Sequence, residues 1–95
     1  MEKVVFRTDY DPYMNMEKYL AVFPNDPCNT GRVAYMGFWF DEYGRTLFEP
    51  YGEMSLDYYY NSTKVVHRNT DVAQKCLKTI EGYYGMMFDV REKIK

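Results

Sequence analysis

The order of its sequence patterns is what most limits how this chain can fold. Residues 3–8, 18–23 and 32–41 are rich in β-branched and aromatic residues, which favour extended strands. Turn-forming residues follow the first run at 9–12, and the polar stretch 24–31 predicts a loop after the second. The second run is almost continuously apolar, so we expect both of its faces to be covered. These runs predict a mainly antiparallel sheet.

The clearest of these strands is 32–41, because its alternation separates two faces. One predicted face consists of Ala34, Met36, Phe38 and Phe40. The other consists of Val33, Tyr35, Gly37 and Trp39. A glycine among large rings predicts either a β-bulge or a place where a ring lies across the backbone.

The segment after this strand predicts shorter elements. Residues 41–44 are typical of a hairpin turn that leads into a strand at 46–48. Residues 49–52 predict another turn. The run 54–60 alternates well enough for a strand, with a short helix as the alternative.

One helix is predicted at about 71–83, where apolar residues recur at helical spacing. Asn69, Thr70 and Asp71 offer N-cap side chains. Gly82 or Gly85 is expected to end the helix, and 86–91 is expected to return as a strand. The fold class is therefore predicted as α+β, with residues 1–95 forming a single domain in which about five strands pack against this helix.

Composition excludes several functions. The net charge of −2 opposes binding to duplex nucleic acid, which requires clustered lysine and arginine. The chain shows no signal segment and no apolar run long enough to cross a membrane, so a cytoplasmic location is expected. Cys28 and Cys76 lack the spacing of a zinc or redox motif and are interpreted as two thiols, although export would permit a disulfide.

Residues with catalytic chemistry are few. His67 is the single histidine, and its position before the helix favours a surface or capping role. Asp9 and Asp11 are two oxygen ligands that could hold a divalent cation, but turn formation is the favoured interpretation. The sequence contains no phosphate-binding glycine loop and no nucleophile or zinc motif. We therefore expect no cofactor, no metal and no enzymatic activity.

Tyrosine supplies the main functional signal, with 11 of 95 residues. A tyrosine ring favours burial while its hydroxyl needs a partner, and such residues are enriched in interfaces. The simplest interpretation is that most rings belong to the core. The functional hypothesis is a protein-binding module, or a homodimer, that uses as anchors Tyr35, Trp39, Tyr58 and Tyr60.

Two alternatives remain open. Single-stranded nucleic acid could stack on the aromatic rings if basic residues gathered beside them. The basic residues that would be needed are Arg32, Arg45, Lys64 and Arg68. A small hydrolase that holds a divalent cation at Asp9 and Asp11 is the third hypothesis.

Four segments resemble a known group of proteins in sequence and order. They are Lys3-Val4-Val5-Phe6-Arg7, Leu20-Ala21-Val22-Phe23-Pro24, Ala34-Tyr35-Met36 and Gly82-Tyr83-Tyr84. The chain resembles small uncharacterised α+β proteins carried by bacterial mobile elements and phages. That group has a stretch with histidine and glycine after its third strand, where this chain has residues 37–41. The resemblance implies a bacterial or phage cytoplasm and an accessory protein that binds a host protein, and it transfers no catalytic residue.

Overall fold

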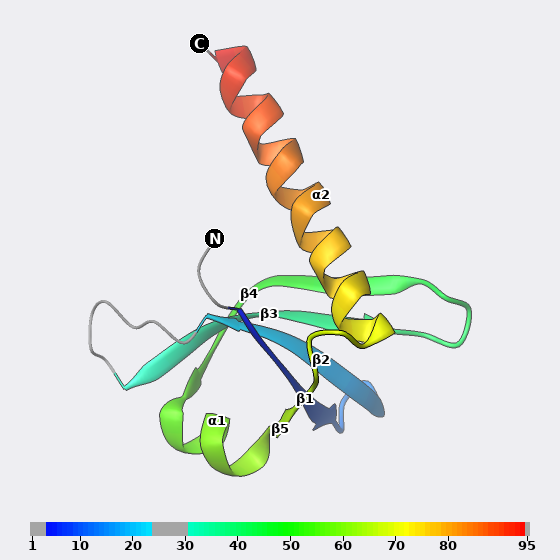
Figure 1. Ribbon diagram of the computed structural model, residues 1–95, viewed down its shortest axis with the longest axis vertical. Coiled ribbons are helices and arrows are strands. Elements are labelled where there is room, and N and C mark those ends of the chain that lie inside the picture. The colour runs from blue at the N-terminus through cyan, green and yellow to red at the C-terminus, as the bar shows by residue number, and fades with distance from the viewer. Residues whose placement is uncertain (1–3, 24–30, 95) are drawn as a thin grey trace.

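A computed structural model describes residues 4–23 and 31–94 of the chain, with side chains as far as residue 83. Its strands are β1 (Val5–Asp11), β2 (Met16–Phe23), β3 (Arg32–Phe40), β4 (Thr46–Ser55) and β5 (Lys64–Val65). Its helices are α1 (Leu56–Ser62) and α2 (Asp71–Ile94) (Figure 1). Most of the predicted loop at 24–31 lies outside the described residues, as does Cys28.

The five strands form one antiparallel sheet in the order β4-β3-β2-β1-β5. The predicted α+β class, with a sheet and a helix in the second half of the chain, is confirmed. The central strand is β2, whose residues Leu20, Ala21 and Val22 have at most 1% of their surface exposed. The prediction that both faces of this strand are covered is therefore correct.

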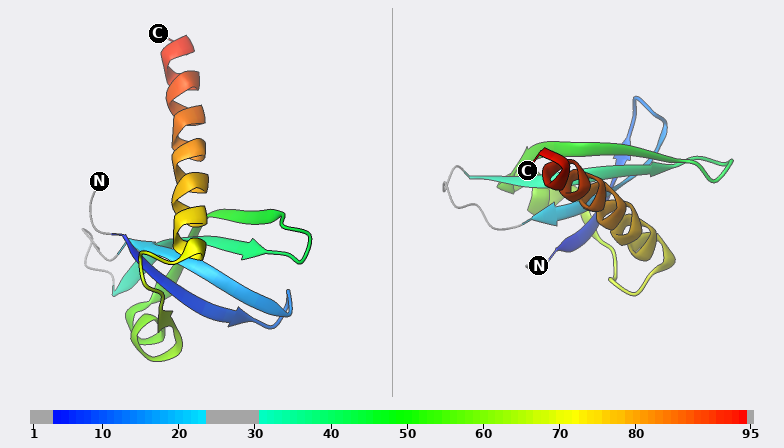
Figure 2. Two further views of the ribbon diagram at one scale, coloured as in Figure 1. Left: turned by 45° about the vertical axis from the view of Figure 1, so that its right-hand side comes forward. Right: turned by 90° about the horizontal axis from the view of Figure 1, so that it is seen from above.

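The two helices lie on opposite faces of the sheet (Figure 2). The core on the α2 face consists of Val4, Phe6, Ala21, Met36, Phe38, Ala73, Cys76 and Ile80. The core on the α1 face consists of Leu20, Val22, Val33, Met54 and Tyr59. Since Met36 and Phe38 belong to one core and Val33 to the other, the predicted alternation of β3 is confirmed.

The expected strand at 54–60 is wrong, because β4 ends at Ser55 and α1 follows it directly. The Ser55 hydroxyl accepts a hydrogen bond from the Tyr58 amide at 3.2 Å, which caps the first turn of the helix. Asp57 adds a negative charge in that first turn, where the helix dipole favours it. The short helix given as the alternative is the structure that forms.

The expected turn at 49–52 is also wrong, since these residues continue β4. Pro50 is tolerated there because β4 is an edge strand, in which one row of amide groups needs no partner. Tyr35 pairs with Gly52 and Gly37 pairs with Glu49, so Pro50 and Tyr51 together lie opposite one residue of β3. This is a β-bulge.

The predicted helix begins as expected, but its predicted end and the strand at 86–91 are wrong. The Thr70 hydroxyl accepts a hydrogen bond from the Ala73 amide at 3.2 Å and caps α2. The helix continues through Gly82 and Gly85 to Ile94, so that its second half extends away from the sheet (Figure 1). Glycine lowers helix stability without forbidding a helix. Among the described residues, no helix has the length and apolar character needed to cross a membrane.

Candidate functional site

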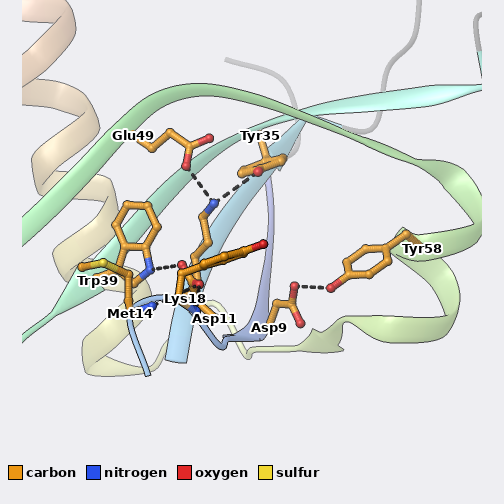
Figure 3. A network of polar contacts seen from close by, with 9 residues as sticks. Asp9, Asp11, Met14, Lys18, Tyr35, Trp39, Glu49 and Tyr58 are labelled. Atoms are coloured by element: carbon orange, nitrogen blue, oxygen red, sulfur yellow. Dashed lines mark hydrogen bonds and ion pairs between the residues drawn. The ribbon is translucent and has the colours of Figure 1, made fainter. Parts of the chain in front are cut away.

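Charged and aromatic side chains from β1 to β4 and from α1 meet on the α1 face of the sheet (Figure 3). We call this set the polar network, and its members are Asp9, Asp11, Lys18, Tyr35, Trp39, Glu49 and Tyr58. Alternation places the β1, β2 and β3 members on the same face as Leu20, Val22 and Val33. The network therefore extends this core toward solvent.

Lys18 lies at the centre of the network. Its ammonium group donates to Glu49 Oε2 at 2.7 Å and to Tyr35 Oη at 3.2 Å. The same nitrogen lies 4.9 Å from the ring centre of Tyr35 and 4.7 Å from that of Trp39. The side chain is 15% exposed, so its charge is enclosed by two aromatic rings and one carboxylate.

These contacts keep Lys18 charged. Burial acts to lower the pKa of the Lys18 ammonium, but the hydrogen bonds with Glu49 and Tyr35 outweigh it and raise that pKa above its ordinary value. Lys18 is therefore a fixed cation at neutral pH. Such a group holds its neighbours in position and does not act as a base or a nucleophile.

Two glycines make room for the network. A Cβ atom at Gly37 would lie 2.6 Å from Lys18 Cε, and one at Gly52 would lie 2.7 Å from Tyr35 Oη. The β-bulge predicted near Gly37 is present, because the register shifts between Tyr35 and Gly37. The Tyr35 ring lies across the backbone at Gly52, on the neighbouring strand, and not at Gly37. Both positions need a residue without a side chain if Lys18 and Tyr35 are to keep their places.

Asp11 fixes the other side of the network. Its Oδ2 accepts a hydrogen bond from Trp39 Nε1 at 3.0 Å, and its Oδ1 accepts from the amides of Tyr13 and Met14 at 2.9 and 3.3 Å. Partial burial acts to raise the pKa of Asp11, but these hydrogen bonds outweigh it and lower the pKa below its ordinary value. Asp11 therefore organises the turn between β1 and β2, as the turn interpretation predicted.

The hydrogen bonds of Asp9 and Asp11 leave these carboxylates poorly suited to bind a divalent cation. Both oxygens of Asp11 already accept protein donors, and Asp9 Oδ2 accepts a hydrogen bond from the Tyr58 hydroxyl at 2.5 Å. Within the part of the chain that the structure describes, no three histidine, cysteine, aspartate or glutamate side chains gather as a metal site would require. The geometry gives the hydrolase hypothesis no support.

Tyr58 combines exposure with a fixed position. Tyr58 is 42% exposed, and its hydroxyl donates a hydrogen bond to the Asp9 carboxylate. The hydrogen bond to the Asp9 carboxylate, helped by partial burial, raises the pKa of Tyr58 to about 12. The phenol is thus neutral over the physiological range, with its ring at the protein surface.

An open pocket of about 400 Å³ lies between Tyr58 and the rest of the network. Its buried lining comes from Leu20 and Met54. Tyr35 and Tyr58 contribute aromatic surface, and the charged lining residues are Asp9, Lys18, Arg32 and Glu53. Apolar and aromatic surface with a few fixed polar groups is typical of a binding site.

The structure unites three of the four predicted anchor residues. Tyr35, Trp39 and Tyr58 belong to the network, whereas Tyr60 is 69% exposed and its ring lies 4.9 Å from that of Tyr59. Tyr58 and Tyr60 would share a face on a strand, but residues two positions apart on a helix point in different directions. Tyr60 therefore contributes to another surface.

The sequence interpretation missed Lys18 and Glu49. Lys18 carried a usable signal, because strand alternation places it on the same face as the buried residues Leu20 and Val22. A charged residue in that register indicates an ion pair or a functional role. Glu49 carried no comparable signal, since it was assigned to a turn.

The basic residues of the nucleic-acid hypothesis do not gather. Arg32 is 3.9 Å from Glu53, and Arg45 forms a 2.7 Å ion pair with Asp41 in the β3–β4 hairpin. Lys64 lies in β5, at the opposite edge of the sheet from β4. Arg32 lies beside Tyr35 and Tyr58 in the pocket, whereas Arg45 and Lys64 lie elsewhere in the sheet, so these three residues do not form one basic surface beside the rings.

Two further predicted residues have structural roles. His67 Nδ1 accepts a hydrogen bond from the Asn69 amide at 3.1 Å, within the turn that leads into α2. Cys76 is a free thiol on the buried face of α2, and burial raises its pKa to about 12. A buried thiol of raised pKa is a poor nucleophile.

Comparison with known proteins gives no relative for this chain: no family model, no curated protein and no solved structure matches it.

Proposed function

We propose that this protein is a non-enzymatic protein-binding module and that its binding surface is the pocket beside Tyr58. The observation that carries the proposal is Tyr58 itself, a ring that is 42% exposed, lies at an open pocket and is held by Asp9. Tyr35 forms part of the pocket wall, and the Trp39 ring packs against Lys18. Tyr60 is not part of this surface.

The physical argument concerns entropy. A partner gains little from a side chain that it must first immobilise, because ordering a flexible side chain costs about 0.5–1.5 kcal/mol. The Tyr58 hydroxyl is already bonded at 2.5 Å, and Lys18 and Tyr35 are fixed by their own contacts. Rigid tyrosines of this kind are common at the energetic centre of interfaces.

The resemblance to proteins of mobile elements and phages supports a more specific setting. We place the module in a bacterial cytoplasm and its partner among host proteins, which it inhibits or adapts. A homodimer that uses the same surface is the other form of the proposal.

The test is affinity capture with the tagged full chain from nuclease-treated bacterial lysate, quantified by mass spectrometry. Loss of a buried anchor costs about 2–4 kcal/mol, so Tyr58→Ala should reduce capture of the specific partner at least tenfold. Tyr60→Ala is the matched control, because it removes another exposed tyrosine from the same helix, outside the pocket. Tyr60→Ala should capture as well as the wild type.

The proposal is wrong if Tyr58→Ala, with an unchanged melting temperature, captures as much partner as the wild type. It is equally wrong if every captured protein disappears after nuclease treatment. Size-exclusion chromatography with light scattering tests the homodimer, which Tyr58→Ala should dissociate.

A further inference from the structure

We infer that the pocket beside Tyr58 receives a basic side chain of the partner, arginine in particular. This inference rests on the proposed function, because it names the chemistry of the group that enters the same pocket.

Negative charges outnumber positive charges in and around the pocket. The pocket and the adjoining network contain the carboxylates of Asp9, Asp11, Glu49 and Glu53 against the cations of Lys18 and Arg32. The charge of Lys18 is neutralised locally, since its nitrogen lies 2.7 Å from Glu49 and the side chain is 15% exposed. The remaining excess of negative charge favours an incoming cation and opposes an acidic group.

The carboxylates of Asp9 and Glu53 can accept further hydrogen bonds from an incoming cation. Tyr58 uses only Oδ2 of Asp9, and Oδ1 forms no hydrogen bond with any residue that the structure describes. An ionised carboxylate can accept several donors, so Asp9 has capacity for a guanidinium group. Glu53 interacts with the Tyr51 hydroxyl, whose pKa it raises, and lies 3.9 Å from Arg32. The Arg32 side chain is 49% exposed and can move aside, and a carboxylate that already serves one hydroxyl can still accept further donors.

The pocket also offers aromatic and apolar surface on which a long cationic side chain could lie. Tyr58 and the free part of Tyr35 offer aromatic surface, and Leu20 and Met54 offer apolar surface for the methylene groups of a long basic side chain. The protein already uses this chemistry on the same face of the sheet, where Arg7 Cζ lies 4.5 Å from the ring centre of Tyr59. Arginine is favoured over lysine because its planar group stacks on rings and can bond to a carboxylate with two donors.

The experiment is a methyl NMR titration of the full chain with N-acetyl-arginine amide. The Leu20 and Met54 methyl groups report on the pocket, and the Ile80 methyl group reports on the other core. We expect shifts at Leu20 and Met54 with a dissociation constant on the order of 1–10 mM and no change at Ile80. The lysine amide should bind more weakly, and the glutamate amide should leave the spectrum unchanged.

Matched variants test the two carboxylates. Asp9→Asn and Glu53→Gln should each weaken arginine binding about threefold to tenfold, because the amide removes the charge but can still accept a hydrogen bond. Glu81→Gln, which removes a carboxylate from the exposed surface of α2, should bind like the wild type. Unchanged Ile80 signals in each variant show that the fold is intact.

Two results would overturn the inference. One is the absence of shifts at Leu20 and Met54 at tenfold the expected dissociation constant. The other is an equal response to the glutamate amide. If either occurs while Tyr58→Ala still abolishes partner capture, the proposed function stands and the arginine assignment fails. If the amide binds but no partner is captured, the pocket chemistry stands and the proposed function fails.

Discussion

At the scale of single residues, the site depends on two positions that have no side chain. Gly37 and Gly52 lie on neighbouring strands, and each leaves space that a network residue fills. Lys18 Cε takes the space at Gly37, and the Tyr35 ring takes the space at Gly52. The glycines therefore act on function indirectly, by allowing a lysine and a tyrosine to lie flat on the sheet.

Replacing Gly52 with alanine tests this arrangement. The new Cβ would lie 2.6 Å from Glu49 Oε1 and 2.7 Å from Tyr35 Oη, so the ring and the carboxylate must move. We expect Gly52→Ala to lower the free energy of unfolding by about 1–3 kcal/mol, as overpacking does. Urea unfolding monitored by tryptophan fluorescence measures the change.

Gly82→Ala is the matched control, because that helical glycine is exposed and a Cβ there would meet nothing within 4 Å. It should raise the free energy of unfolding by about 0.5–1 kcal/mol, since alanine favours helix. Equal effects of the two substitutions would contradict the claim that Gly52 holds space for Tyr35.

At the scale of elements, α1 decides which tyrosines belong together. A strand over 54–60 would have aligned Tyr58 with Tyr60, whereas the helix directs Tyr58 to the pocket and Tyr60 elsewhere. Ser55 starts this helix by accepting a hydrogen bond from the Tyr58 amide. The same serine therefore contributes to the position of the Tyr58 ring.

Ser55→Ala should cost about 1 kcal/mol of stability, the usual effect of losing an N-cap side chain. Ser62→Ala is the control, because it removes a hydroxyl from the exposed other end of α1. Thermal unfolding followed by circular dichroism distinguishes the two. A Ser55→Ala variant as stable as Ser62→Ala would show that the cap does not hold α1 in place.

Sequence reasoning predicted the elements whose patterns are local and missed those decided by tertiary contacts. Residues 32–41 and 71–83 show strong strand and helix periodicity, and both elements formed, although the helix continues beyond its predicted end to Ile94. Pro50 and Gly52 suggested a turn because the sequence cannot show that they lie on an edge strand beside Tyr35. Residue type was enough to identify Trp39, Tyr35 and Tyr58 as candidates. Their proximity to Lys18 depends on the order of the strands, which no local pattern encodes.

At the scale of the whole molecule, both edges of the described sheet oppose the addition of another strand. The β4 edge contains Pro50 and a bulge. At the other edge, β5 has two residues and pairs only with Arg7 and Thr8, and the rest of β1 includes the charged residues Asp9 and Asp11. Prolines, bulges and short edge strands all disfavour pairing between sheets. A partner or second copy is therefore expected to bind a face of the molecule and not an edge of the sheet.

The stability of the whole fold should fall in alkaline solution. The pKa of Lys18 is raised, and that of Tyr58 is raised from 10.0 to about 12, so the fold favours the protonated form of both groups. Their contribution is complete below the pKa values of the unfolded chain and is lost as the pH rises through the folded values. The buried Cys76 thiol, whose pKa is raised from 9.0 to about 12, acts in the same direction. The free energy of unfolding should therefore decline between about pH 9 and 12.

Tyr58→Phe provides the comparison, because it removes the titrating hydroxyl and keeps the ring. Denaturant unfolding at a series of pH values should give a shallower alkaline decline for Tyr58→Phe than for the wild type. Identical slopes would mean that the hydrogen bond between Tyr58 and Asp9 does not form in solution.

The position of Trp39 gives this protein a built-in optical reporter. It is the single tryptophan of the chain, with Lys18 Nζ 4.7 Å from its ring centre and Asp11 bonded to its indole nitrogen at 3.0 Å. The colour of indole emission depends on charges near the ring, because the excited state has a different dipole from the ground state. Any event that moves Lys18 or protonates Asp11 should therefore change the emission of one fluorophore, so that the site can be followed without a label.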